Sequence, residues 1–203
     1  KLFGGTWFGR SVFESVAFVK LSSAAKVPDL QLHSLPWAYP SPNQDNTEVR
    51  PDVDKRAAFT ILPTLIYPES RGELTLRSTD PDEAPHIDPN YLAESRDTET
   101  LIRGIELTRE IMADPAIAGE VTGELHPAQD AATDAQLRQE LPRRICTVYH
   151  PVGTCRMGID ERAVVGPDLR VRGIDGLWVA DASIFPSITG GNTNAPCLMI
   201  GER

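Results

Sequence analysis

The sequence predicts an α+β fold in which an antiparallel sheet lies under helices. The first part of the chain holds segments with the alternating or branched composition of strands, and its middle holds two segments with helical periodicity. Strands that come first and helices that follow as a separate group are typical of this class. From about residue 144 the composition changes to short apolar segments bounded by glycine and aspartate turns, which indicates a second part of the molecule.

Four segments before residue 80 have the character of strands. Residues 13–21 alternate imperfectly, and residues 30–35 alternate cleanly, which predicts a strand with one buried face. Residues 58–66 are rich in branched side chains, and residues 73–77 alternate again. Because residues 68–72 between the last two segments have turn chemistry, we expect these segments to pair as an antiparallel hairpin.

A long surface loop is predicted for residues 36–55, which are rich in Pro, Asn, Asp and Ser. Trp37 and Tyr39 are the large apolar groups of this loop. They either line a substrate pocket or pin the loop to the core, and pinning is the interpretation we favour.

Two helices follow. Asp97 is the expected cap of the first, which runs to about Ala113 and ends before Asp114-Pro115. Its expected apolar face and edge are Leu101, Ile105, Thr108 and Met112, with Ile102 and Leu107. Thr133 or Asp134 is expected to cap the second helix, residues 135–141.

Charge and composition exclude several classes of function. The net charge of -9 argues against a nucleic-acid surface, because phosphate binding needs clustered Lys and Arg. No apolar run has the length of a transmembrane helix, and no targeting pattern precedes the first strand. Cys146, Cys155 and Cys197 are odd in number and lack metal-site spacing, so neither disulfides nor a zinc site is indicated. A reducing cytoplasm is the expected location.

The candidate catalytic residues lie in the last quarter of the chain. His150 follows a β-branched and aromatic segment and precedes a Pro and Gly turn, so it should end a strand with its ring facing a cavity. Asn192 follows Gly190-Gly191 in a similar position. A neutral imidazole beside a carboxamide suits removal of a hydroxyl proton and stabilisation of the oxyanion that results. The alternatives are a histidine that satisfies a turn and an asparagine that serves as a turn residue or helix cap.

Several motifs in this order resemble the carboxyl-terminal part of the glucose-methanol-choline (GMC) family of flavin-dependent oxidoreductases. The main ones are YHPVGTCRMG at residues 149–158 and VVGPDLRVRGIDGLWVADASIFPSITGGNTNAPCLMIGER at residues 164–203. Upstream, residues 27–33, 67–78 and 85–91 also resemble the family. Choline dehydrogenase-like and alcohol dehydrogenase-like bacterial members are the most similar branch, because Asn192 stands where other branches carry histidine.

The resemblance implies a reaction and two catalytic residues. His150 would act as the general base that accepts the hydroxyl proton of an alcohol, while hydride passes to N5 of FAD. Asn192 would donate its side-chain amide to the alkoxide. The substrate would be a choline-like, aliphatic or polyol alcohol, and the electron acceptor stays open.

The resemblance also implies domains and cofactor contacts. Residues 1–143 would belong to the substrate-binding domain, and residues 144–203 would return to the FAD-binding domain. The backbone of Thr193 and Asn194, at the start of a helix, would face the flavin pyrimidine, and Asp181 and Ala182 would lie near the ribityl chain. The same helix is expected to carry three residues into the core: Leu198, Met199 and Ile200.

The Gly-x-Gly-x-x-Gly turn that holds the FAD pyrophosphate in such enzymes does not occur in these 203 residues. We therefore expect the sequence to be a piece of a longer polypeptide whose FAD-binding region precedes Lys1. Two alternatives stay open. One is a hydroxynitrile lyase with the same fold, and the other is a non-catalytic binding domain on a short chain.

Overall fold

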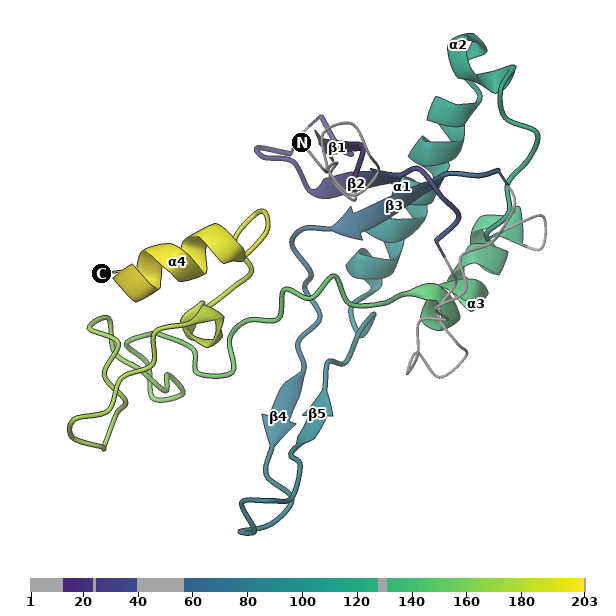
Figure 1. Cartoon of the computed structure of the whole chain (residues 1–203). Coiled ribbons are helices and arrows are strands. Elements are labelled where there is room, and N and C mark those ends of the chain that lie inside the picture. Colours follow the sequence, from purple (N-terminus) through teal and green to yellow (C-terminus); the bar gives the residue numbers. More distant parts are fainter. Residues whose placement is uncertain (1–12, 24, 40–56, 128–130, 203) are drawn as a thin grey trace, which may run out of the picture. The chain divides into compact units, whose positions relative to one another are not determined.

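The computed structural model describes residues 13–23, 25–39, 57–127 and 131–202. These residues belong to two compact units, both drawn in Figure 1. The first unit comprises Lys1–Leu65 and Glu94–Cys146, and the second comprises Ile66–Ala93 and Thr147–Arg203. The chain passes between the two units three times, after Leu65, after Ala93 and after Cys146. Residues 66–93 cluster with the second unit, and the assignment of residues 1–143 and 144–203 to two domains stays a prediction.

A three-stranded antiparallel sheet forms the centre of the first unit (Figure 1). Its strands are β1 (Ser15–Val19), β2 (Leu30–Leu35) and β3 (Thr60–Leu65), in that spatial order. Together with the helices of this unit, the sheet confirms the predicted α+β class.

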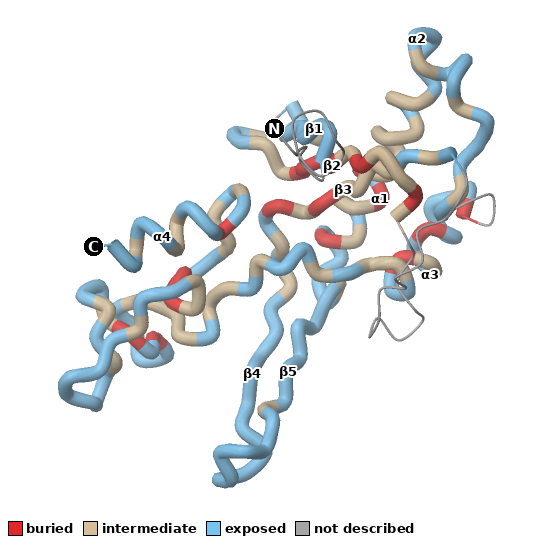
Figure 2. The backbone as a smooth tube through the Cα atoms, viewed as in Figure 1, coloured by how far each residue is buried: buried red, intermediate tan, exposed pale blue. Residues whose placement is uncertain are grey.

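The central strand β2 is buried on both faces, and not on one face as its alternating sequence predicted. Gln31 and His33, on the polar side of the pattern, are as buried as Leu30 and Leu32 (Figure 2). The His33 ring packs against Phe13 with the ring centroids 4.7 Å apart. The sequence of a strand shows only which of its own side chains are apolar. The residues that cover its second face lie elsewhere in the chain, so their presence cannot be predicted from the strand alone.

The helix α1 (Ser95–Met112) packs on the sheet at β3. It begins three residues earlier than predicted, with Glu94 in the extended conformation at the N-cap position. The prediction that Asp97 caps the helix is therefore wrong. Asp97 lies buried inside the first turn, where a carboxylate interacts favourably with the helix dipole.

Gly104 allows α1 to approach the sheet closely. A Cβ at this position would lie 3.0 Å from side-chain atoms of both Leu30 and Pro63. Ile102 and Gly104 are the buried members of this part of the helix. The residues predicted to face the core are half-buried: Leu101, Ile105, Thr108 and Met112. The Thr108 hydroxyl donates to the Gly104 carbonyl over 2.9 Å.

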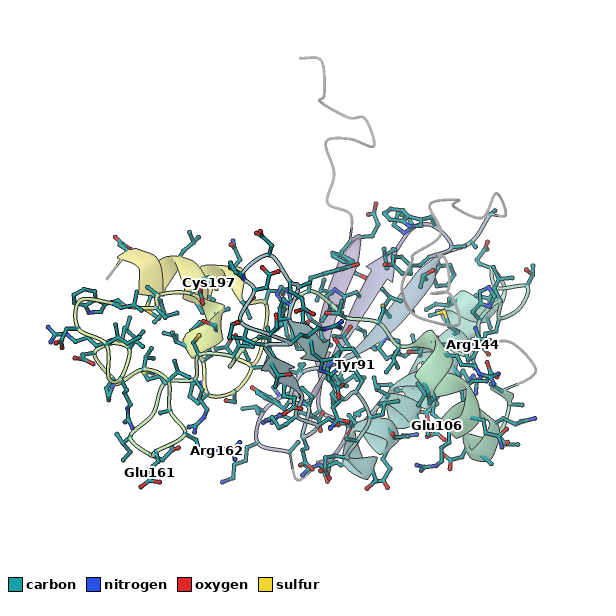
Figure 3. The ribbon with its side chains drawn as sticks, turned by 90° about the horizontal axis from the view of Figure 1, so that it is seen from below. Tyr91, Glu106, Arg144, Glu161, Arg162 and Cys197 are labelled. Atoms are coloured by element: carbon teal, nitrogen blue, oxygen red, sulfur yellow. The ribbon has the colours of Figure 1, made fainter. Side chains whose placement is uncertain are left out.

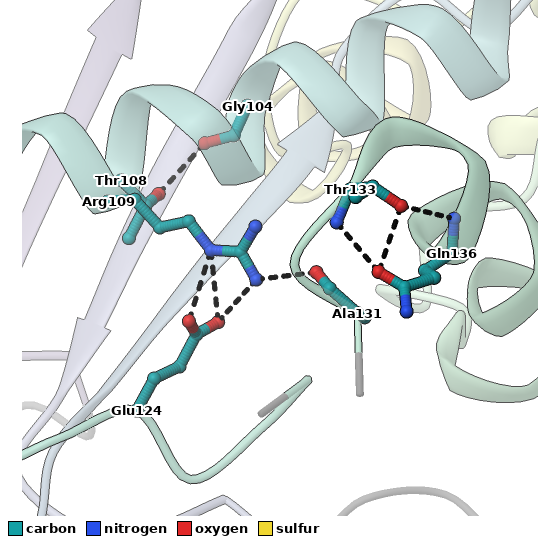
Figure 4. Close-up of polar contacts among 7 residues, drawn as sticks. All are labelled: Gly104, Thr108, Arg109, Glu124, Ala131, Thr133 and Gln136. Atoms are coloured by element: carbon teal, nitrogen blue, oxygen red, sulfur yellow. Dashed lines mark hydrogen bonds and ion pairs between the residues drawn. The ribbon is translucent and has the colours of Figure 1, made fainter. Parts of the chain in front are cut away.

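Polar contacts hold the loop that follows α1 and the start of the last helix of the first unit (Figure 4). Asp114 caps the short helix α2 (Pro115–Ala118). Arg109 then holds the following loop, with its Nε 3.0 Å from Glu124 Oε2 and its Nη2 donating to the Ala131 carbonyl over 3.0 Å.

Helix α3 (Asp134–Arg144) begins with a capping box, which confirms Thr133 as its cap. The Gln136 amide N–H donates to Thr133 Oγ1, and the Thr133 backbone N–H donates to Gln136 Oε1. The helix includes Pro142 and continues to Arg144, beyond the predicted end at residue 141. Proline is rare inside a helix because it removes one backbone hydrogen bond, yet here the helix continues past it.

The predicted pairing of residues 58–66 with residues 73–77 is wrong. β3 pairs with β2, and β4 (Glu73–Thr75) pairs with β5 (His86–Asp88) as a separate two-stranded ribbon. The chain passes from the first unit to the second between Leu65 and Ile66, which separates the two segments. β5 has three residues between two prolines, and a strand of this length gives no periodic signal.

The C-terminal part of the second unit has little regular structure. Isolated bridges join Met157 to Val165, Val165 to Val171 and Arg170 to Trp178, in the region of short apolar segments bounded by turns. Its core is formed by Val165, Ile184 and Phe185. Glu161 and Arg162 project from an outer turn of this part, and Cys197 lies on its final helix (Figure 3).

That final helix, α4, spans Asn194–Glu202. The sequence predicted a start at about Thr193, one residue earlier. Cys197 and Ile200 pack against the core, but Leu198 and Met199 are 66% and 52% exposed. The expectation that these two residues enter the core is wrong, because residues three or four positions apart share a helix face and adjacent ones do not. Among the described residues, no helix combines the length and apolar character needed to cross a membrane.

Candidate functional site

The two motif segments of the last quarter lie side by side within the second unit. The Cys155 amide donates to the Ser183 carbonyl over 2.9 Å, and the Met157 amide donates to the Ile184 carbonyl over 2.7 Å. Gly153 has a φ of +94°, which favours glycine. These backbone contacts connect the segment that carries His150 to the segment that leads to Asn192.

A local turn sets the backbone just before His150. The Tyr149 amide donates to Thr147 Oγ1 over 2.9 Å, as in turns closed by a threonine side chain. Tyr149 itself has a φ of +63°, in the left-handed region that is uncommon for bulky residues. Strained backbone of this kind is concentrated at functional sites.

The structure brings His150 and Asn192 together. Nε2 of His150 lies 2.7 Å from Nδ2 of Asn192, and Nδ1 of the same ring lies 2.9 Å from Oγ1 of Thr193. His150 is half-buried, Asn192 is exposed and Thr193 is 7% exposed. Both ring nitrogens of His150 therefore have polar partners in one short segment at the start of α4.

The side chain of Thr193 is a part of this site that the sequence analysis missed, since only its backbone was considered. The sequence did contain a signal for this residue, because Thr193 places a side-chain hydroxyl directly after Asn192. Tyr67 was missed as well. A Cβ on Gly190 would collide with the Tyr67 hydroxyl, so the glycine lets this tyrosine reach the loop that carries Asn192.

Asp181 bonds locally. Its Oδ1 accepts from the Ser183 hydroxyl and, over 2.8 Å, from the Ser183 amide, which caps the short 3-10 helix Ala182–Ile184. These hydrogen bonds lower the pKa of the Asp181 carboxyl below its usual value because they favour its charged form. Ala182 packs at the edge of the core. Contact of either residue with a cofactor stays a prediction.

Thr193 and Asn194 lie where α4 begins. The Thr193 carbonyl accepts from the Cys197 amide over 3.0 Å, which is the first bond of the helix. The first N–H groups of a helix have no carbonyl partner within it, and they carry partial positive charge. The start of α4 can therefore hold an electron-rich group.

Arg156, next to this turn, has a structural role. Its guanidinium binds Asp160 through two bonds, of 2.7 and 2.9 Å. This pairing holds the pKa of the Asp160 carboxyl well below its usual range. Arg172 donates to the carbonyls of Gly158 and Asp160, so both arginines stabilise the same loop.

The sequence profile of the GMC oxidoreductase family matches residues 68–201. The chain therefore belongs to the GMC oxidoreductases. It is 40% identical to an alcohol dehydrogenase [acceptor] from Pseudomonas putida, over 95% of this chain and 34% of that protein. It is also 40% identical to an oxygen-dependent choline dehydrogenase from Sinorhizobium medicae, over 94% of this chain and 34% of that one.

Solved structures agree with this membership. Pyridoxine 4-oxidase from Mesorbium loti matches 94% of this chain with a TM-score of 0.80 and 31% identity, and this chain covers 36% of it. A formate oxidase from Aspergillus oryzae, whose FAD modification has been studied, matches 89% with a TM-score of 0.76 and 26% identity, and 31% of it is covered. The chain thus spans about a third of the length of the relatives it matches.

Proposed function

We propose that this chain carries the catalytic residues of an FAD-dependent oxidoreductase that oxidises the CH–OH group of an alcohol. The observation that carries the proposal is the 2.7 Å contact between His150 Nε2 and Asn192 Nδ2. The contact supports the proposal because a proton acceptor and a hydrogen-bond donor this close together could both reach a single hydroxyl group. The names of the relatives, an alcohol dehydrogenase and a choline dehydrogenase, support an alcohol as the substrate.

The polarity of this contact supports a separate role for each residue. The Asn192 nitrogen can only donate, so the Nε2 of His150 that faces it presents its lone pair. A hydroxyl group donates one hydrogen bond and accepts others. A substrate alcohol could therefore bind between the two side chains and replace their direct hydrogen bond with one bond to each. Its O–H would then point at His150 Nε2, and its oxygen would accept from Asn192 Nδ2. As the proton leaves for His150, the Asn192 amide stabilises the charge that develops on the oxygen.

The residues at the start of α4 fit the flavin end of FAD. The backbone amides of Thr193 and Asn194 would face the flavin pyrimidine, where the positive end of the helix favours negative charge. Asp181 and Ala182 would lie near the ribityl chain. FAD, when bound, supplies the acceptor for the hydride of the carbinol carbon. The 203 residues contain no Gly-x-Gly-x-x-Gly turn, so this chain would hold only that end of the cofactor.

The test uses the full-length protein that contains this chain, purified with its flavin. Anaerobic mixing with choline, with an aliphatic alcohol and with a polyol is expected to bleach the flavin absorbance for at least one of them. The alternative of a hydroxynitrile lyase predicts cleavage of a cyanohydrin without bleaching.

Replacement of His150 by glutamine tests the base directly. We expect His150→Gln to keep the flavin and to lower the rate of flavin reduction by about 10²–10⁴, the usual contribution of a positioned base. His86→Gln is the matched control, because His86 lies on the exposed ribbon strand β5. A His150→Gln enzyme that reduces its flavin as fast as the wild type would refute the proposal.

A further inference from the structure

The second hydrogen bond of His150 is not used in the reaction described above. It joins Nδ1 to Thr193 Oγ1 over 2.9 Å, on the side of the ring away from Asn192. Thr193 is 7% exposed, so water competes little for this bond. A buried hydroxyl on the far side of a catalytic imidazole can accept the N–H proton of the ring and hold the ring in place.

The arrangement of donors specifies the tautomer. A neutral imidazole has one N–H and one lone pair. Because the Asn192 amide nitrogen donates, Nε2 must accept, and the single proton of the neutral ring then lies on Nδ1. The Nδ1–H group therefore donates, and Thr193 Oγ1 is its acceptor.

We propose that Thr193 is a positioning residue, whose hydroxyl accepts the Nδ1 proton of His150 and keeps Nε2 free to take the proton of the substrate. The inference rests on the proposed function and adds a specific requirement to it. The same bond persists when the ring becomes protonated, since Nδ1–H donates in both states. Thr193 therefore stabilises the ring before and after proton transfer without moving.

The position of Thr193 suits this role. Its carbonyl begins the α4 hydrogen-bond ladder by accepting from the Cys197 amide, so its backbone is held by the helix. Threonine is branched at Cβ, which restricts the rotation of its side chain. The hydroxyl is thus presented to His150 from a rigid element, which is what precise orientation of a base requires.

The test compares Thr193→Val with Thr193→Ser in the full-length, flavin-loaded protein. Valine keeps the shape of the side chain but cannot accept the Nδ1 proton. We expect Thr193→Val to lower kcat on the order of 10- to 100-fold with KM little changed, as for lost partners of other functional histidines. Thr193→Ser, which retains the hydroxyl, should keep most of the activity.

Thr189→Val is the matched control. Thr189 lies on the same loop, and within the described part of the chain its buried Oγ1 has no hydrogen-bond partner. Loss of a hydroxyl without a partner is close to neutral, so this variant should keep both the activity and the flavin.

The tautomer can be read without turnover. In protein labelled with ¹⁵N-histidine, the signals of His150 are assigned by their loss in His150→Gln. We expect a protonated Nδ1 and an unprotonated Nε2 in the wild type. In Thr193→Val the Nδ1 proton loses its acceptor and only Asn192 still favours this tautomer, so we expect a larger share of the tautomer protonated on Nε2. A wild-type ring with its proton on Nε2 would overturn the inference, and this measurement decides the matter even if Thr193→Val loses its flavin.

Failure of this inference is distinguishable from failure of the proposed function. If His150→Gln is impaired while Thr193→Val turns over like the wild type, the role of Thr193 is wrong and the base assignment stands. If His150→Gln itself is fully active, the base assignment is wrong, and the role of Thr193 falls with it.

Discussion

The first unit and the C-terminal part of the second unit hold their residues in place by different means. In the first unit a buried central strand and a closely packed helix form a regular core, with β2 between β1 and β3. In the C-terminal part, isolated bridges and side-chain contacts replace regular strands, and the His150 site lies there. Catalytic residues often lie on irregular segments positioned by a scaffold. The comparison predicts that substitutions in the two regions affect different properties.

Among the substitutions that compare the two regions, Asn192→Asp is expected to have the largest effect, and it should act on turnover rather than folding. It replaces an amide donor by a carboxylate next to the oxygen on which negative charge develops. A carboxylate at this position would also stabilise the protonated ring of His150, 2.7 Å from the present amide. We expect the rate of flavin reduction to fall by about 10²–10³, as when one oxyanion donor is lost.

The measurement is anaerobic stopped-flow reduction of the flavin in the full-length protein, with flavin content and unfolding midpoint as controls. A variant that reduces its flavin at the wild-type rate would show that Asn192 is a turn residue only. A large drop in the unfolding midpoint would remove the contrast between the two regions.

Gly104→Leu should have the opposite signature, because it lies where α1 meets the sheet. Its Cβ alone would lie 3.0 Å from the side chains of Leu30 and Pro63, so a larger side chain must push the helix from the sheet. We expect a loss of about 1–3 kcal/mol in the free energy of unfolding, the usual cost of overpacking. Urea unfolding of the full-length protein measures it, and the kcat of the folded fraction should be retained.

Gly119→Leu is the matched control for this substitution. A Cβ on Gly119 meets no atom within 4 Å, and its backbone is in the right-handed helical region. This variant should change the stability by no more than about 0.5 kcal/mol. Equal destabilisation by the two leucines would mean that the close approach at Gly104 has no special cost.

The smallest expected effect concerns the loop that Arg156 and Asp160 stabilise, and it appears as a dependence on pH. The pKa of Asp160 is held below its usual value by Arg156, so the folded state binds this proton more weakly than the unfolded state. The pair therefore contributes stability above the ordinary aspartate value of about 3.9, and this contribution is lost as the pH falls below it.

Thermal unfolding of the wild type and of Asp160→Asn should show this difference. At neutral pH the wild type is expected to unfold at a slightly higher temperature, and the gap should narrow as the pH falls toward 4 and below. A gap that is constant or widens on acidification would contradict the role assigned to the ion pair.

Local features were well predicted because they depend on neighbouring residues. The period of residues 30–35 and the threonine before residue 134 were sufficient to place β2 and the start of α3. The motifs around His150 and Asn192 singled out both residues, and the structure brings them to 2.7 Å. Such signals are contained in short stretches of sequence.

By itself, the sequence determined the fold class, the family and the candidate catalytic residues. Only the tertiary structure decided the pairing of β4 with β5, the burial of both faces of β2 and the contact of Thr193 with His150. The physical reason is that the burial of β2 and the contact of Thr193 depend on partners distant in the sequence, 43 positions apart for Thr193 and His150, whereas β5 is too short to give a periodic signal. A periodic pattern reports which side chains prefer burial, but the identity of the groups that cover them is set by the packing of the whole unit.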